Sequence, residues 1–118
     1  MGVYQIRNLR SNRILVGSTL NLDAMFNRHE FQLRLGKHPN ASLQRDWLEH
    51  GRDSFVFEVL DELEPREGVT WDYRADLASL EEIWLEKLNP YDGAGYNERK
   101  KDRDELLRDM MTRRTEAG

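Results

Sequence analysis

Residues 54–60 carry the clearest strand signal in the chain, and this segment constrains the fold most. Phe55, Phe57 and Val59 recur at every second position, which places their side chains on one side of an extended segment. A lone strand is not stable in water, so this one has to pair with others. Two more segments rich in strand-forming residues lie on either side of a turn sequence near the N-terminus, at 3–8 and 13–17. The sequence therefore predicts a hairpin and a third strand in one small sheet.

Three other segments have the apolar spacing of helices. The first is preceded by the candidate caps Ser18, Thr19 and Asn21, and it reaches Leu35, after which Gly36 supplies a left-handed stop. The apolar stripe of this first helix consists of Leu22, Met25, Phe26, His29 and Leu33.

The second predicted helix starts at Pro39-Asn40 and ends at Gly51, with Leu43 and Trp47 on one face. The third predicted helix covers residues 75–88, and its buried face consists of Leu77, Leu80, Trp84 and Leu88.

The order of these elements, β-β-α-α-β-α, predicts an α+β domain over residues 1–97. Its core is expected to be a small three-stranded antiparallel sheet flanked by helices. Residues 98–118 mix charges densely and are predicted to form a charged helical tail. The narrow apolar strip of this tail, which is a candidate for homodimer formation, consists of Leu106, Leu107, Met110 and Met111.

Composition excludes several classes of site. The 118 residues contain no cysteine, which rules out disulfides, thiolate zinc sites and cysteine nucleophiles. No apolar run approaches the roughly 18 residues of a membrane span, and no signal-peptide pattern opens the chain. Glycine-rich phosphate loops are also absent. We therefore expect a soluble cytoplasmic protein with no membrane partner and no organic cofactor.

The net charge of −4 argues weakly against a nucleic-acid partner, but the charges are unevenly distributed. Residues 1–50 hold seven Lys or Arg against four Asp or Glu, together with all three histidines. Residues 51–92 hold four against twelve, and residues 93–118 hold seven against six. The acidic block could face away from a polyanion, so the distribution of charge matters more than its sum.

Glu81 is an anomaly in the third predicted helix. It follows Leu77 by four residues and precedes Trp84 by three, so it shares their apolar face. Glu82 and Glu86 point elsewhere and are expected to be solvated. A carboxylate on an apolar stripe is costly unless it is paired, hydrogen-bonded or bound to a cation. Two interpretations stay open: a boundary glutamate paired with an arginine, or a metal ligand or catalytic carboxylate.

The histidines and Tyr4 give weaker signals. His29 falls on the inner stripe of the first helix, His38 precedes a proline in a turn, and His50 ends the second helix. Their spacing matches no dedicated metal site, and each is more simply interpreted as structural. Tyr4 lies early in the first strand and suits either the core or a site.

The order of short motifs along residues 2–97 resembles that of GIY-YIG nucleases. Gly2-Val3-Tyr4 is followed, after ten residues, by Leu15-Val16-Gly17, which resembles the paired signature of the family. The other matching pieces, in chain order, are Gly17-Ser18-Thr19, Asn21-Leu22, His29, Gly36-Lys37-His38, Leu43-Gln44, Phe55-Val56-Phe57-Glu58, Glu81 to Trp84 and Gly95-Tyr96-Asn97. The fold of the family, a three-stranded antiparallel sheet flanked by helices, agrees with the prediction above.

The resemblance implies hydrolysis of a DNA phosphodiester assisted by one divalent ion, Mg²⁺ or Mn²⁺. It implies that Glu81 is the metal ligand, and a carboxylate oxygen suits Mg²⁺. It further implies that Tyr4 takes a proton from the attacking water, that His29 assists at the site and that Asn97 helps to order it. A metal-bound Glu81 would also explain why this residue interrupts an apolar stripe.

Two family positions are substituted. The tyrosine of the second triplet is Leu15 here, and the arginine of the first helix is Met25. Losing one preorganised group aimed at developing charge typically costs roughly 10²–10³ in rate. Arg28 is a neighbour of Met25 on the helix surface and is a candidate to replace the missing arginine.

The sequence leaves two main functions open, and a purely structural interaction module is a third possibility. The first is a metal-dependent DNA endonuclease or nickase, weakened by the two substitutions. The second is a catalytically degenerate GIY-YIG domain that binds nucleic acid or a protein partner without cleavage. Sequence segments such as Gly36-Lys37-His38-Pro39-Asn40 are also similar to segments of stand-alone bacterial proteins labelled LuxR-type or ArsR-type regulators. In either case the candidate phosphate contacts are Arg7, Arg10, Arg13, Arg28, Arg34 and Lys37.

Overall fold

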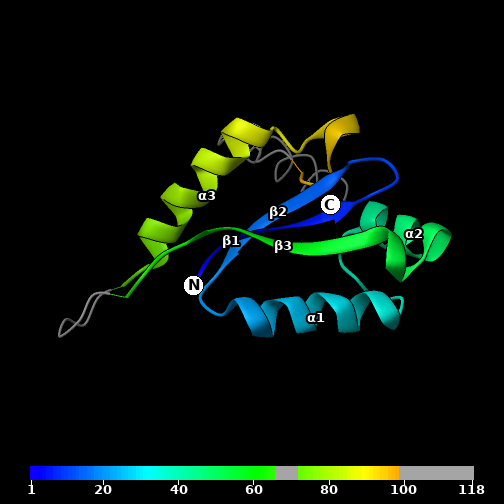
Figure 1. Ribbon diagram of the computed structural model, residues 1–118, viewed down its shortest axis with the longest axis horizontal. Helices are drawn as coiled ribbons and strands as arrows, with labels where there is room; N and C mark the ends of the chain where they lie inside the picture. Colours follow the sequence, from blue (N-terminus) through cyan, green and yellow to red (C-terminus); the bar gives the residue numbers. More distant parts are fainter. Residues whose placement is uncertain (66–71, 99–118) are drawn as a thin grey trace, which may run out of the picture.

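The computed structural model describes residues 1–65 and 72–98, and these residues form one sheet with helices on both of its faces (Figure 1). The elements in chain order are β1 (Gly2–Asn8), β2 (Ile14–Thr19), α1 (Leu22–Arg34), α2 (Ala41–His50), the 3-10 turn η1 (Arg52–Ser54), β3 (Phe55–Glu62), α3 (Arg74–Leu88) and the 3-10 turn η2 (Asp92–Ala94). The predicted tail strip from Leu106 to Met111 lies outside the described residues.

The sheet has the strand order β2-β1-β3, and both pairings are antiparallel. The predicted three-stranded antiparallel sheet flanked by helices is therefore confirmed. The hairpin between β1 and β2 closes through a hydrogen bond from the backbone N–H of Asn8 to the carbonyl of Arg13. Asn12 in this turn has a φ of 62°, a left-handed conformation that asparagine tolerates.

A bulge in β3 changes the side of the sheet that its last residues face. Tyr4 pairs with Val59 and Val3 pairs with Asp61, so Leu60 is an extra residue in β3. Leu60 packs with Val3 on one face of the sheet, while Val59 is 44% exposed on the other.

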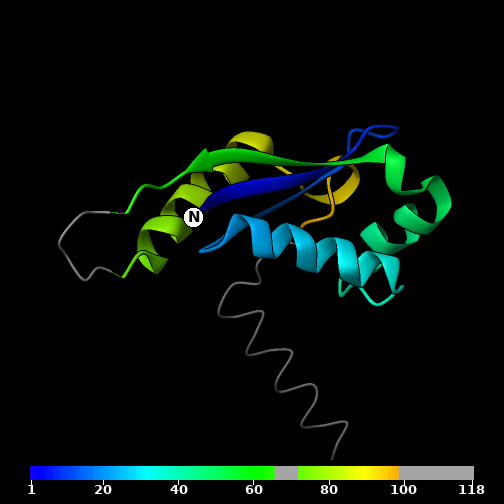
Figure 2. The ribbon, with the colours of Figure 1, turned by 60° about the horizontal axis from the view of Figure 1, so that its bottom comes forward.

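Two apolar clusters fix the helices to the sheet. On one face, side chains from β1, β3, α1, α2 and the segment after α3 form a core of Ile6, Leu33, Leu43, Trp47, Phe55 and Tyr96. On the opposite face, α3 packs Leu80, Trp84, Leu85 and Leu88 against Val3, Ile14 and Val16. Figure 2 shows α1 lying along the sheet and α2 at the end where β3 begins.

The helix ends follow the local chemistry of the sequence. The Asn21 side chain caps α1 by accepting from the N–H of Ala24 at 3.0 Å, and Asn40 caps α2 in the same way. Gly36 follows α1 with a φ of 73°, as predicted. Ser18 and Thr19 belong to β2 and not to a helix cap, so the cap prediction is confirmed for Asn21 and was wrong for Ser18 and Thr19. None of the helices in the described ranges has the length and apolar character needed to cross a membrane.

Candidate active site

Tyr4 and His29 meet where α1 covers β1. The Tyr4 hydroxyl lies 2.7 Å from Nε2 of His29, and the Phe26 ring packs edge-on against the Tyr4 ring. Burial and the nearby charge of Glu81 raise the pKa of Tyr4 to about 12, with Arg28 acting in the opposite direction. The strand and the helix thus bring together two of the predicted site residues and place Glu81 and Arg28 within electrostatic reach of them.

Gly17 is required for this position of Tyr4. The two residues pair across β1 and β2, and a Cβ added at Gly17 would lie 2.6 Å from the Tyr4 hydroxyl oxygen. Because real Cβ atoms do not approach so closely, the ring can lie over β2 only if position 17 has no side chain.

Glu81 projects from α3 toward the end of β2. The Ser18 hydroxyl donates a hydrogen bond to Glu81 Oε2 at 2.6 Å, across 63 positions of sequence. Glu81 is half-buried, whereas Glu82 and Glu86 are exposed as predicted. In the described ranges the partner of this carboxylate is a hydroxyl and not the arginine that one interpretation required. Ser18, Leu77 and Glu81 also border a hollow of about 250 Å³.

Arg28 lies beside the same residues and faces solvent. Its charge lowers the pKa values of both Tyr4 and His29. Among the residues that the structure describes, no carboxylate forms an ion pair with it. Met25, one turn earlier on α1, is half-buried.

His29 makes a second contact through its other ring nitrogen. His29 Nδ1 lies 2.8 Å from Nε2 of His38, and the two ring planes are inclined by only 23°. Burial, followed by His38 and Arg28, lowers the pKa of His29 to about 4. His38 is itself buried, and its pKa is also lowered by burial. The sequence alone favours a structural role for His38, and its isolated position in a turn gives no signal of this contact.

Asn97 binds the edge of the sheet next to the site. Its Oδ1 accepts from the backbone N–H of Val16 at 2.7 Å, and its Nδ2 donates to the Val16 carbonyl at 2.8 Å. Both ends of the amide are therefore engaged by β2, immediately before Gly17 and Ser18. Asn97 thus holds the strand that carries site residues, and within the described ranges its side chain bonds to Val16 and not to Tyr4, His29 or Glu81.

Leu15 lies on the same face of the sheet as Tyr4 but contributes to the core. It pairs with Ile6 across the hairpin and packs against the apolar cluster below α1 and α2. The substitution at this position thus replaces a hydroxyl with apolar packing.

The predicted phosphate contacts divide into two groups. Arg7 forms an ion pair with Glu58 at 2.9 Å, and Arg13 binds Asp46 at 3.2 Å while its guanidinium lies over the Tyr96 ring. Arg10 donates to Ser54 Oγ at 3.1 Å. By contrast, the cations of α1 and its C-terminal end are exposed, and these are Arg28, Arg34 and Lys37.

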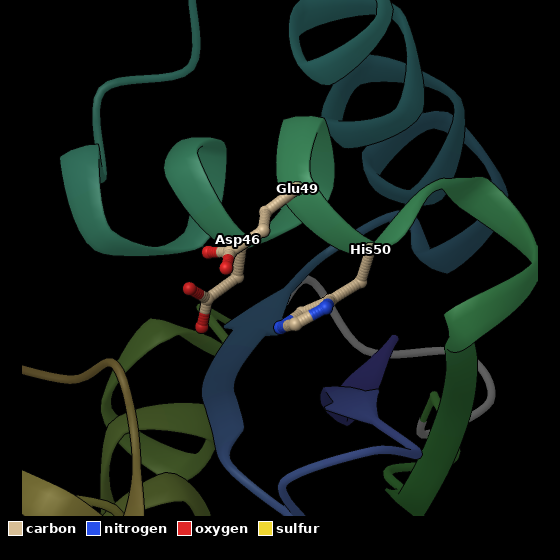
Figure 3. A group of neighbouring side chains, drawn as sticks. All are labelled: Asp46, Glu49 and His50. Atoms are coloured by element: carbon tan, nitrogen blue, oxygen red, sulfur yellow. The ribbon is translucent and has the colours of Figure 1, made fainter.

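A second cluster of candidate metal ligands lies on α2 (Figure 3). One ligand atom from each of Asp46, Glu49 and His50 falls within 4.8 Å of the others. The Asp46 carboxylate, however, already accepts from Arg13 and from the hydroxyl of Tyr96 at 2.7 Å. Arg13, which binds Asp46, directly precedes β2, whereas Ser18, which binds Glu81, lies near the end of that strand. The cluster on α2 is therefore separate from Glu81, and its buried carboxylate has protein partners.

Comparisons with known proteins agree with this geometry. The profile of the GIY-YIG catalytic domain family matches residues 1–97. Intron-associated endonuclease 1 of Enterobacteria phage T4 is 33% identical over 89 residues, which are 75% of this chain and 33% of that protein. The chain thus spans a third of the length of this curated relative.

Solved structures show the same similarity in three dimensions. The catalytic domain of homing endonuclease I-TevI superposes with a TM-score of 0.69 at 29% identity, covering 84% of this chain and 98% of that domain. A point mutant of the same catalytic domain gives a TM-score of 0.67 at 29% identity, covering 86% and 95%. The chain is therefore similar to the catalytic part of an endonuclease.

Proposed function

The chain belongs to the GIY-YIG catalytic domain family, and we propose that it is a metal-dependent DNA endonuclease or nickase that hydrolyses phosphodiester bonds. The observation that carries the proposal is the position of Glu81. Its carboxylate is kept on the apolar side of α3, is oriented by Ser18, and lies close enough to Tyr4 to raise the pKa of that hydroxyl. Holding a half-buried carboxylate there is costly, and a bound cation would offset the cost.

The residues around Glu81 suit a single Mg²⁺ or Mn²⁺ ion. Ser18 occupies Oε2, and no donor in the described ranges is bound to Oε1. The adjoining hollow of about 250 Å³ leaves room for water and for a phosphate. Mg²⁺ is usually bound by one or two carboxylates and keeps several waters. When bound, such an ion would stabilise the charge that develops on the phosphate and on the leaving oxygen.

Tyr4 is proposed to take the proton of the attacking water. Burial and Glu81 raise the pKa of its hydroxyl to about 12, so the resting side chain is protonated. It has to release its own proton to a water molecule before the phenolate can take the proton of the attacking water. The charge of Glu81 is one of these two causes, so neutralisation of that charge favours the phenolate. His29, at 2.7 Å, is placed to stabilise the oxygen as it loses its proton.

Arg28 is proposed to replace the arginine that the family has at Met25. Its charge already acts on Tyr4 and His29, and its exposed guanidinium can reach a phosphate that approaches them. Arg34 and Lys37 are proposed as further phosphate contacts. Arg7 and Arg13 are weaker candidates, because each has a carboxylate partner within the protein.

The domain boundaries, the oligomeric state and the cellular location are also part of the proposal. We assign residues 1–97 to the nuclease domain and 98–118 to a tail that supports a homodimer, in a cytoplasmic protein. No organic cofactor is needed for the proposed hydrolysis.

A catalytically degenerate domain is the second candidate. It is favoured by Leu15, whose side chain fills the core where the family has a hydroxyl. Such a protein would bind DNA through the exposed cations of α1 without cutting it.

Nicking of supercoiled plasmid, combined with a gel-shift assay on the same samples, separates the two functions. We expect nicking by the wild type in Mg²⁺ or Mn²⁺ and none in EDTA. A DNA shift without nicking in any divalent ion would favour the degenerate domain. If the protein neither nicks nor shifts DNA, the nuclease proposal and the degenerate DNA-binding proposal are both contradicted.

A further inference from the structure

A backbone group fixes the hydrogen-bonding state of His38. The backbone N–H of Asn40 lies 3.0 Å from Nδ1 of His38. A backbone N–H can only donate, so Nδ1 of His38 has to accept and carries no hydrogen. The pKa of His38 is lowered by burial, which favours the neutral ring. A neutral imidazole carries one N–H, and in His38 that hydrogen is on Nε2.

This assignment determines the direction of the next two hydrogen bonds. The Nε2–H of His38 donates to Nδ1 of His29 at 2.8 Å. Since Nδ1 of His29 accepts, the single hydrogen of its neutral ring is on Nε2. His29 therefore donates to the Tyr4 oxygen at 2.7 Å. The whole series runs in one direction, from the backbone of Asn40 through two imidazoles to Tyr4.

The turn that holds His38 is itself well supported. Gln44, buried on α2, accepts from the backbone N–H of His38 at 2.9 Å and donates to the Leu33 carbonyl at 3.0 Å. The Asn40 side chain caps α2 and also donates to the carbonyl of Tyr96 at 2.7 Å. These bonds hold the donor of Asn40 and the ring of His38 in a fixed relation.

We propose that His38 is a positioning residue that, oriented by the backbone N–H of Asn40, holds His29 in the tautomer that donates to the Tyr4 oxygen. The inference rests on the proposed nuclease function for its catalytic meaning, but the tautomer itself does not depend on catalysis. His29 then acts as a hydrogen-bond donor and not as a base, because its only lone pair faces His38. The phenolic proton of Tyr4 is left free to point away from His29, and the bond from His29 stabilises the oxygen when that proton passes to a water molecule.

Nitrogen-15 NMR of the imidazole rings tests the tautomers directly, because the shift of each ring nitrogen reports whether it carries hydrogen. At neutral pH we expect hydrogen on Nε2 and none on Nδ1 in both His29 and His38. Hydrogen on Nδ1 of His29 in the wild-type protein would overturn the proposal, whether or not the protein cuts DNA.

Variants at position 38 test the role of the side chain. His38→Phe removes the donor, so we expect His29 to populate the Nδ1–H tautomer. His38→Gln offers both an amide donor and an amide acceptor, so it is expected to restore the wild-type nitrogen shifts. His50→Phe, which changes the third histidine, is the matched control and should leave the His29 shifts unchanged. If His29 keeps the same tautomer in His38→Phe, the positioning role of His38 is overturned. If this variant does not fold, the nitrogen shifts of the wild-type protein still decide the tautomer.

Activity provides the second readout. For metal ligands, loss of an outer hydrogen-bond partner typically costs about 10–100-fold in metal affinity or activity, and we take the same order of effect for the partner of His29. We expect His38→Phe to lower kcat for nicking by that amount with KM unchanged, and His38→Gln to recover most of it. Equal kcat in the wild type and His38→Phe would contradict the positioning role, while an inactive wild type with the expected nitrogen shifts would contradict only the proposed function.

Discussion

The hydroxyl of Ser18 lies 2.6 Å from Oε2 of Glu81 and joins the edge strand β2 to helix α3. The contact lies on the α3 face of the sheet, where Ser18 pairs with Val3, whereas Tyr4 meets His29 of α1 on the opposite face. The orientation of the proposed metal ligand therefore depends on a residue that sequence patterns assigned to a helix cap.

Ser18→Ala is expected to weaken cation binding without abolishing it. Loss of an outer hydrogen bond to a ligand typically costs about 10–100-fold in metal affinity. The Mn²⁺ concentration that gives half-maximal nicking should rise by this factor. Ser79→Ala, an exposed serine on α3, is the matched control and should leave that concentration unchanged. An equal metal requirement in the two variants would contradict the role of Ser18.

Gly17→Ala is expected to damage the site more than the fold. The added Cβ would lie 2.6 Å from the Tyr4 hydroxyl oxygen, so the ring has to move. Misplacement of a reacting group by about 1 Å can cost roughly 10²-fold in rate, while overpacking typically costs about 1–3 kcal/mol of stability. Nicking rates and denaturant unfolding measure the two effects. Gly93→Ala, whose Cβ would meet no atom within 4 Å, should change neither, and a fully active Gly17→Ala would refute the placement of Tyr4.

Stability is expected to fall as the pH drops from about 6.5 to about 4, in part because of His29. Its pKa is lowered from 6.5 to about 4 by burial, then by His38 and Arg28. In that window the unfolded chain binds more protons than the folded one, so the free energy of unfolding rises with pH. The contribution is complete above pH 6.5 and is lost as the pH falls to 4. Denaturant unfolding across this range should show that the advantage of the wild type over His29→Gln shrinks on acidification. A pH-independent difference would show that the pKa of His29 is not lowered.

Arg28→Ala and Arg34→Ala are expected to differ in the step that they affect. If Arg28 faces the reacting phosphate, its loss should lower kcat by roughly 10²–10³-fold, as for other groups aimed at developing charge. Arg34→Ala should weaken DNA binding for all sequences and reduce the salt slope by about 1. Single-turnover nicking and gel shifts at several salt concentrations separate the two effects. Identical behaviour of the two variants would show that Arg28 is an ordinary phosphate contact.

The fold was predictable wherever local sequence decides the structure. Asn21 and Asn40 cap helices through side chains that reach only three residues along the chain. Gly36 ends α1 because it adopts a positive φ at no steric cost. The bulge at Leu60 was not predicted, because it depends on how β3 aligns with β1 and not on the composition of β3.

The site was predictable only in part. Glu81 could be found because a carboxylate on an apolar helix face is energetically conspicuous. The partners of the site residues could not be found in this way, since Ser18 meets Glu81 and His38 meets His29 only after distant segments have packed. The roles of Tyr4, His29, Arg28 and Asn97 stay predictions, as does the similarity to regulator-like proteins.

Single-turnover nicking of supercoiled plasmid by Glu81→Gln and Glu82→Gln tests the central claim most directly. The two glutamates are adjacent on α3, but only Glu81 is held by Ser18 near Tyr4, whereas Glu82 is exposed. Both variants lose the same charge and should fold alike. The account predicts that Glu82→Gln nicks at the wild-type rate in Mg²⁺ or Mn²⁺ and that Glu81→Gln falls at least about 100-fold, to background. Wild-type nicking by Glu81→Gln, or equal background from all three proteins, would contradict it.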